Sequence, residues 1–249
     1  MRSSKNLLLS VFTVLAMVAA SFVVHAADPV SSISAEDSLD LLLHGNEFYA
    51  RGSLGNLVHE SLPKTREQLA AGQHPYAIVV SCSDSRVSPE IVFNKGLGEI
   101  FVVRVAGNIV APQSCSLEQP KLGSHELGSI EYAVEHLGTK LILVLGHEQC
   151  GAVKATVNYF KNPVDLGPNL MSLVDAIYPA VVQADFDHPQ VPDGALAEFS
   201  ADENIRMVLE QIEADSAIIR DAIETMGVKM AGYKYGISSG LVREVVPLH

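Results

Sequence analysis

Residues 140–150 read Lys140-Leu-Ile-Leu-Val-Leu-Gly-His-Glu-Gln-Cys150, an apolar run that leads directly into polar side chains. The segments Tyr76–Cys82 and Ile100–Arg104 are similarly apolar. Uninterrupted runs of this kind are typical of strands buried on both faces of a sheet. Between the second and third runs, residues 123–138 carry apolar side chains at helical spacing. Strands that alternate with helices predict an α/β fold with a mostly parallel central sheet flanked by helices.

The rest of the chain is predicted to be mostly helical, with two strands at its end. Ser34 and Asp37 have capping-box spacing before one helix, and Ser200 and Glu203 have it before another. A loop rich in Pro and Asp is expected at residues 185–194. The last strand is expected to be an antiparallel edge strand. The expected helices are Ala35–Ala50, Thr65–Ala71, Val153–Phe160, Asn169–Val182 and Ala201–Met226, and the expected terminal strands are Val228–Ile237 and Leu241–Val246.

Candidate metal ligands follow two of the predicted strands. Cys82 ends the first strand, and His147 and Cys150 come directly after the third. In open α/β sheets the chemistry collects beyond the carboxyl ends of the strands, so these side chains can meet if the two strands are neighbours. Two thiolates and one imidazole suit zinc, and three protein ligands leave a fourth position open for catalysis. A disulfide between Cys82 and Cys150 is the alternative, and Cys115, in a loop outside both segments, is interpreted as a spare thiol.

Asp84 and Arg86 follow Cys82 at intervals of two residues. In an extended turn this spacing directs the three side chains to a common side. An Asp near the metal could accept a hydrogen bond from the fourth ligand, and an Arg could hold that carboxylate bidentately. We therefore predict that Asp84 and Arg86 form a catalytic dyad.

The segments 82–90, Cys-Ser-Asp-Ser-Arg-Val-Ser-Pro-Glu, and 146–152, Gly-His-Glu-Gln-Cys-Gly-Ala, resemble the two signature motifs of β-class carbonic anhydrases. The resemblance also includes residues 98–108, 129–133 and 232–235. It implies the fold of that family, with one Zn²⁺ per subunit on Cys82, His147 and Cys150. The implied reaction is reversible hydration of carbon dioxide to bicarbonate and a proton by attack of zinc-bound hydroxide.

The same resemblance implies a substrate pocket shared between subunits, and hence a homodimer or a tetramer. Gln73, nine residues before Cys82, matches a glutamine that contacts substrate across the dimer interface in plant-like members. Phe101 and Tyr132 match apolar wall positions, and Gly151 matches a residue whose backbone N–H faces bound substrate.

Regulation by bicarbonate and a different substrate are the two alternatives that stay open. One bicarbonate-regulated subgroup carries Trp where this chain has Val79, which argues against that regulation here. Tyr235, however, matches the tyrosine of the same subgroup. A related hydrolase of carbon disulfide or carbonyl sulfide would use the same zinc core and differ in access to the pocket. The Gln73 match favours carbonic anhydrase.

The first 26 residues have the order of a secretory signal peptide. Arg2 and Lys5 precede an apolar stretch, and small residues follow near Ala26. We expect cleavage there, export to the periplasm, and a single catalytic domain over residues 27–249; a retained membrane anchor is the alternative.

The chain is acidic, with a formal net charge of −12. Loss of residues 1–26 would remove Arg2 and Lys5 and no acidic residue, leaving −14. A chain of this charge repels phosphate backbones, so no nucleic-acid partner is expected.

Overall fold

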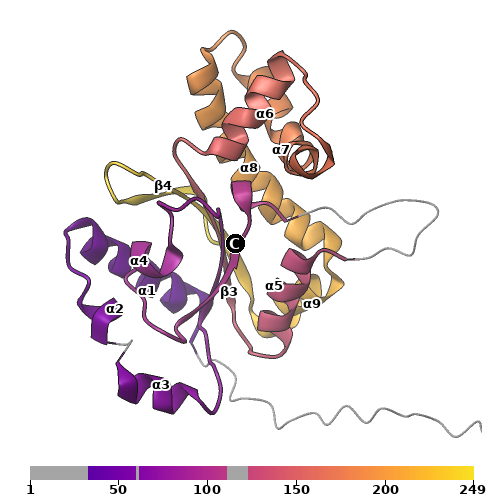
Figure 1. The fold of residues 1–249 in the computed structure, drawn as a ribbon. Helices are drawn as coiled ribbons and strands as arrows, with labels where there is room; N and C mark the ends of the chain where they lie inside the picture. The colour runs from indigo at the N-terminus through magenta and orange to yellow at the C-terminus, as the bar shows by residue number, and fades with distance from the viewer. Residues whose placement is uncertain (1–32, 60–61, 111–122) are drawn as a thin grey trace, which may run out of the picture.

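A five-stranded sheet forms the centre of the molecule in the computed structural model, which describes residues 33–59, 62–110 and 123–249 (Figure 1). The strand order is β2-β1-β3-β4-β5. The first four strands are mutually parallel, and β5 runs antiparallel to β4 at the edge, which confirms the predicted fold class. The strands are β1 (Ala77–Ser81), β2 (Ile100–Arg104), β3 (Leu141–His147), β4 (Lys229–Tyr235) and β5 (Val242–Val246).

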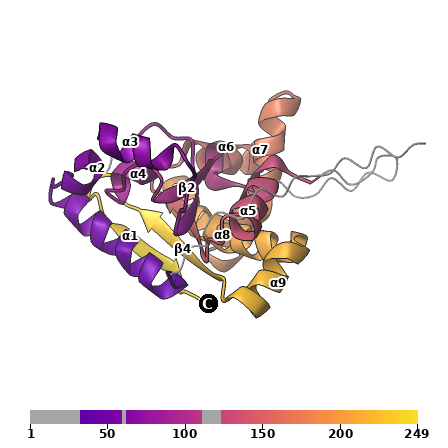
Figure 2. The ribbon, with the colours of Figure 1, turned by 90° about the horizontal axis from the view of Figure 1, so that it is seen from below.

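Helices cover both faces of this sheet (Figure 2). The helix expected at Ala35–Ala50 has the predicted bounds, but two short helices in the first half of the chain, Gly55–His59 and Pro89–Val92, were not predicted. The helices are α1 (Ala35–Ala50), α2 (Gly55–His59), α3 (Pro63–Leu69), α4 (Pro89–Val92), α5 (His125–Glu135), α6 (Gly151–Lys161), α7 (Pro168–Asp187), α8 (Asp193–Asp215) and α9 (Ala217–Met226), with a 3₁₀ turn, η1, at Ala106–Asn108.

Alternate residues of the strands belong to two separate cores. Val79 and Leu143 pack with α1 and α4 on one face. Ile78 and Val144 pack with α5, α8 and α9 on the other face. Since successive side chains of a strand point to opposite faces, a strand buried on both must be apolar throughout. This explains the uninterrupted runs of the sequence.

A third apolar cluster lies beyond the carboxyl ends of the strands. It joins α6, α7 and the start of α8, and it includes Cys82 and Cys150. In Figure 1 these helices project from the sheet as a separate layer. The cysteines are therefore enclosed where the sheet meets this helical layer.

The predicted start of the long C-terminal helix is wrong. α8 begins at Asp193, and Ser200 lies inside it, fully buried, with its hydroxyl donating to the Leu196 carbonyl at 2.7 Å. The helix then breaks at Ser216, whose hydroxyl accepts from Ile219 N at 3.1 Å and caps α9. As a result the expected loop 185–194 shrinks to a few residues. By contrast Ser34 caps α1 as predicted, accepting from Asp37 N at 3.0 Å.

Two expectations concern residues outside the described ranges. These are the signal peptide at residues 1–26 and the state of Cys115. Within the described ranges, none of the helices combines the length and apolar composition needed to cross a bilayer.

Candidate metal centre

Two adjacent central strands bring the candidate ligands together. β1 and β3 pair in parallel with Ser81 opposite Leu145, so both strands end at the same edge of the sheet. Cys82 follows β1, and His147 is the last residue of β3. Cys150 is the N-cap of α6, after a tight turn in which Gln149 has a positive φ of 56°. The predicted meeting of the two segments is confirmed.

The ligand atoms of Cys82, His147 and Cys150 all lie within 4.8 Å of one another, and all three residues are buried. Tetrahedral zinc with Zn–S of about 2.3 Å and Zn–N of about 2.0 Å places its ligands about 3.5–3.8 Å apart. The cluster therefore needs only small shifts to bind such an ion. Cys82 and Cys150 are both free, so the disulfide alternative is not what the structure has.

His147 presents one ring nitrogen to this cluster. Its Nδ1 lies 2.8 Å from the Glu148 carbonyl oxygen, which can only accept, so Nδ1 carries the proton. In the neutral ring Nε2 is then an acceptor, and it is buried with no hydrogen-bond partner among the described residues. A buried polar atom without a partner is costly, and a metal ion would satisfy this one. The donor set therefore fits zinc.

The two cysteines shift each other's pKa in opposite directions. A hydrogen bond from Cys150 is the main cause that lowers the pKa of the Cys82 thiol, with further contributions from the N–H groups of Gly107 and Asp84. The same hydrogen bond, together with burial, raises the pKa of Cys150. A divalent cation in place of the shared proton would stabilise both thiolates.

Asp84 lies at the side of the cluster and is held by Arg86. The guanidinium donates from Nε to Oδ1 at 2.9 Å and from Nη2 to Oδ2 at 2.7 Å, the expected bidentate contact. Arg86 also donates its backbone N–H to Oδ1 at 3.0 Å. These hydrogen bonds hold the pKa of Asp84 well below its usual range. Oδ2 lies 3.9 Å from His147 Nε2, so an ionised carboxylate faces the ligand cluster.

The backbone around these residues is fixed by a second arginine. Arg104, at the end of β2, donates to the carbonyl oxygen of Cys82 at 3.1 Å and to that of Asp84 at 2.9 Å. The turn that carries the ligand and the carboxylate is therefore fastened to the neighbouring strand.

Comparison with known proteins identifies this arrangement. The family model described as carbonic anhydrase matches residues 77–242. The chain is 35% identical over 175 residues to carbonic anhydrase 2 of Mycobacterium tuberculosis, covering 70% of this chain and 76% of that protein. It resembles the solved Coccomyxa β-carbonic anhydrase in complex with acetazolamide, with 26% identity, a TM-score of 0.63 and coverage of 74% and 77% of the two chains. The chain belongs to the β-class carbonic anhydrase family.

A tetrameric β-carbonic anhydrase of Sordaria macrospora has the same fold, with a TM-score of 0.65 at 23% identity over 86% of this chain and 99% of the other. The Cys82, His147 and Cys150 triad is typical of the zinc site of β-class carbonic anhydrases.

The residues expected to line the substrate pocket do not all lie beside the ligands of their own chain. Gly151 does, as the first residue of α6, where a helix leaves its N–H without an intrahelical partner. Phe101 pairs with Ile78 near the start of the strands, and its ring lies 6.4 Å from that of Tyr132 on α5. Phe101 and Tyr132 thus meet each other away from the Cys82 end of β1.

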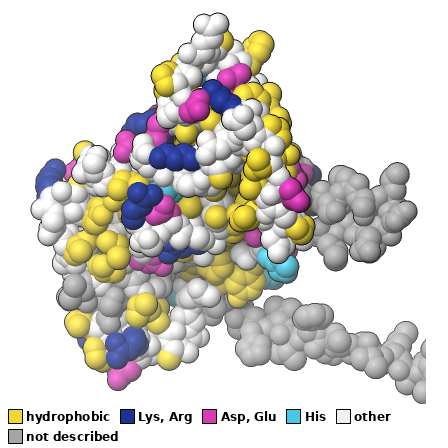
Figure 3. Space-filling model, turned by 45° about the horizontal axis from the view of Figure 1, so that its top comes forward, with side chains coloured by type: hydrophobic (Ala, Val, Ile, Leu, Met, Phe, Trp, Pro, Cys, Tyr) yellow, Lys and Arg dark blue, Asp and Glu magenta, His cyan; other side chains and the backbone are white. Residues whose placement is uncertain are grey.

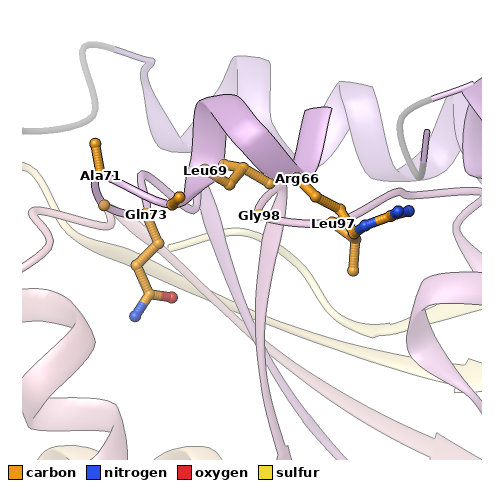
Figure 4. A pocket seen from close by; sticks show the side chains of 8 residues that line it. Arg66, Leu69, Ala71, Gln73, Leu97 and Gly98 are labelled. Atoms are coloured by element: carbon orange, nitrogen blue, oxygen red, sulfur yellow. The ribbon is translucent and has the colours of Figure 1, made fainter. Parts of the chain in front are cut away.

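Gln73 lies before β1, whereas Cys82 follows it. At about 3.3 Å per residue, β1 alone puts about 13 Å between its first and last residues. Gln73 is exposed beside an open groove of about 580 Å³ that α3 and the Leu97–Gly98 loop line (Figure 4). In this view its amide extends away from α3.

Several residues that support the site were missed by sequence reasoning. Gly107 donates its N–H to Cys82 Sγ at 3.2 Å, and Glu198 on α8 accepts the N–H of Gln149 at 2.9 Å. Lys234, on β4, is buried and pairs with Glu198. Lys234 lies between two buried tyrosines of β4, which was a signal for a buried ion pair, but its partner lies 36 residues away and belongs to no sequence motif.

Proposed function

We propose that this carbonic anhydrase hydrates carbon dioxide reversibly to bicarbonate and a proton, with one Zn²⁺ per subunit on Cys82, His147 and Cys150. The observation that carries the proposal is the Asp84 carboxylate, which Arg86 holds with Oδ2 3.9 Å from the unpartnered Nε2 of His147. A ligand cluster alone would suit a structural ion; a fixed carboxylate beside it suits catalysis. The chemistry that zinc supplies is Lewis acidity, which makes hydroxide available as a nucleophile near neutral pH.

Asp84 would orient that nucleophile. An ionised carboxylate accepts hydrogen bonds and donates none, so Asp84 draws the hydrogen of the nucleophile toward itself and leaves a lone pair for carbon dioxide. Arg86 keeps the carboxylate ionised and fixes its plane through two parallel hydrogen bonds. The N–H of Gly151 is placed to stabilise negative charge that develops on a substrate oxygen.

The rest of the substrate pocket would come from a second subunit. Because β1 separates Gln73 from Cys82, we assign the Gln73 amide to the site of a partner copy, with Phe101 and Tyr132 as apolar wall. The helices α1, α4 and α5, the N-cap of α3 and the Leu97–Gly98 loop also expose large apolar side chains, which water disfavours and an interface would bury. These are Leu41, Phe48, Leu62, Ile91, Leu97 and Tyr132.

A homodimer, or a tetramer built from such dimers, follows from this assignment. Figure 3 shows hydrophobic side chains gathered in patches on the surface, with positive and negative side chains interspersed between them.

Export to the bacterial periplasm is a further part of the proposal, and it rests on the sequence of residues 1–27 alone. Cell fractionation with mass spectrometry of the mature N-terminus tests it. Protein that retains residues 1–26 would contradict it.

The decisive experiment pairs zinc content with stopped-flow carbon dioxide hydration across pH. We expect one zinc per chain and a rate that disappears on chelation and returns with added zinc. A hydration rate indistinguishable from buffer in the zinc-loaded protein would reject the proposed function.

A further inference from the structure

Every polar group of Gln149, in both its backbone and its side chain, takes part in a hydrogen bond. Its N–H donates to Glu198 Oε1 at 2.9 Å, and its side-chain Nε2 lies 3.3 Å from the same oxygen. Its carbonyl oxygen accepts from Arg86 Nη2 at 3.4 Å, and its Oε1 accepts from Lys154. Gln149 lies between His147 and Cys150, so its backbone conformation sets the relative positions of two ligands.

That conformation is an unusual one. Gln149 has a φ of 56°, in the left-handed region that non-glycine residues rarely adopt. Such a residue persists only where surrounding contacts compensate for it. The Glu198 carboxylate is the charged group among these contacts that accepts the backbone N–H, and hydrogen bonds to a charged acceptor are the stronger kind.

Glu198 is in turn fixed from behind by Lys234. The Lys234 side chain is 2% exposed, and its ammonium lies 2.7 Å from Glu198 Oε2 and 3.2 Å from Asp202 Oδ1. It also donates to the Glu198 carbonyl oxygen at 2.9 Å. Asp202 has a second partner in Arg243, 2.6 Å away. Glu198 thus contacts the buried Lys234 through Oε2 and accepts hydrogen bonds from the ligand turn through Oε1.

We propose that Glu198, fixed by Lys234, is a positioning residue that holds the His147–Cys150 turn in its metal-binding geometry. The proposal rests on the proposed function, since it assumes that this turn binds zinc. Outer contacts of a metal site commonly change metal affinity or activity by about 10–100-fold when removed. Neither residue touches substrate, and both act through Gln149.

The test compares variants at Glu198 and Asp202. Both carboxylates pair with Lys234, but among the described residues Glu198 is the one of the two that has hydrogen bonds to the ligand turn. We expect Glu198→Ala to speed zinc release to a chromogenic chelator by about 10-fold or more, and Glu198→Gln, which retains an acceptor oxygen, to do so less. Asp202→Asn, the matched control, should lower the melting temperature but leave zinc release at the wild-type rate.

Cobalt substitution supplies a second readout that does not depend on turnover. The visible bands of a cobalt–thiolate site report ligand geometry, so Glu198→Ala should shift them and Asp202→Asn should not. Equal effects of the two variants on zinc release, or a Glu198→Ala spectrum identical to wild type, would overturn the positioning role. Wild-type protein that binds no zinc would instead reject the proposed function, so the two failures are distinguishable.

Discussion

Gly107 donates its backbone N–H to the sulfur of Cys82 at 3.2 Å, from a turn in which its φ is 80°. The carbonyl oxygen of the same glycine accepts from Asn204 Nδ2 on α8 at 2.8 Å. Gly107 thus stabilises the Cys82 thiolate through its N–H and is held to α8 through its carbonyl oxygen. A side chain at this position meets both a conformational and a steric obstacle.

Gly107→Ala is expected to destabilise the fold and weaken the metal site. Its Cβ would lie 2.6 Å from Ile177 Cδ1, which is fully buried and has little room to move. The left-handed backbone and the overlap together cost about 2–4 kcal/mol. Urea unfolding measures the loss, and zinc content measures the effect on Cys82.

A glycine elsewhere serves as the control. Gly128 lies in α5, where an added Cβ meets nothing within 4 Å. Gly128→Ala should stabilise the protein by about 0.5–1 kcal/mol through helix propensity. An unfolding free energy for Gly107→Ala equal to wild type would show that the turn accommodates a side chain.

Cys82→Ser is expected to abolish zinc binding. Zinc prefers a thiolate here, and a serine hydroxyl remains protonated near neutral pH. Elemental analysis should find less than about 0.1 zinc per chain, with no hydration activity. Cys115→Ser, which changes a thiol outside both motifs, should keep the wild-type zinc content; equal loss in both variants would argue against the assigned ligands.

Asp84→Asn is expected to keep zinc and lose turnover. Asn has the same shape but cannot offer the ionised carboxylate that accepts from Arg86 and from the nucleophile. We expect kcat for carbon dioxide hydration to fall by about 10–100-fold at an unchanged metal content. Unchanged kcat in stopped-flow assays would remove Asp84 from the mechanism and leave it as a structural partner of Arg86.

Thiol accessibility distinguishes a metal site from a redox pair. In a Cys115→Ser background only Cys82 and Cys150 remain, and both are free and buried in the structure. We expect no thiol to react with Ellman's reagent in the zinc-loaded protein and two to react after chelation in denaturant. Zero thiols under both conditions would indicate that the two cysteines form a disulfide in the isolated protein.

Subunit mixing tests whether Gln73 serves a partner copy. Gln73→Ala homodimers would have zinc but no amide, and Cys82→Ser homodimers would have the amide but no zinc. A mixed dimer would contain one complete site, because the zinc of the first chain meets the Gln73 of the second. Activity after unfolding and refolding together should therefore exceed the mean of the two separate samples.

The opposite arrangement predicts no recovery. With Gln73 acting in its own chain, each mixed dimer would contain the same defective sites as the parents. A co-refolded sample whose activity equals the mean of the two would thus contradict the shared pocket.

Features with local causes could be predicted from the sequence. Ser34 caps α1 because its hydroxyl accepts from Asp37 N, three residues away. Ser200 and Glu203 have a similar local pattern, yet Ser200 lies inside α8, where tertiary packing around Leu196 carries the helix upstream. The capping pattern shows that a serine could cap a helix at that position. Whether the helix starts there depends on which residues are buried by tertiary packing.

The metal ligands were predictable for a different reason. Cys82 and His147 each end an apolar run, and the geometry of a parallel sheet brings such ends together. The contact between Glu198 and Gln149 has no comparable rule, since it depends on how α8 crosses the sheet. Contacts of that kind become visible only in three dimensions.

The strand β1 lies between Gln73 and Cys82, and the proposed shared pocket would therefore link catalysis to association. If Gln73 serves a neighbouring chain, an isolated subunit would have the zinc ligands of one site and the Gln73 amide of another. It would therefore contain no complete active site. Specific activity would then vary with protein concentration and decline on dilution below the dissociation constant of the dimer, although every chain stayed folded and loaded with zinc. In that case the enzyme would be active only as an assembled dimer.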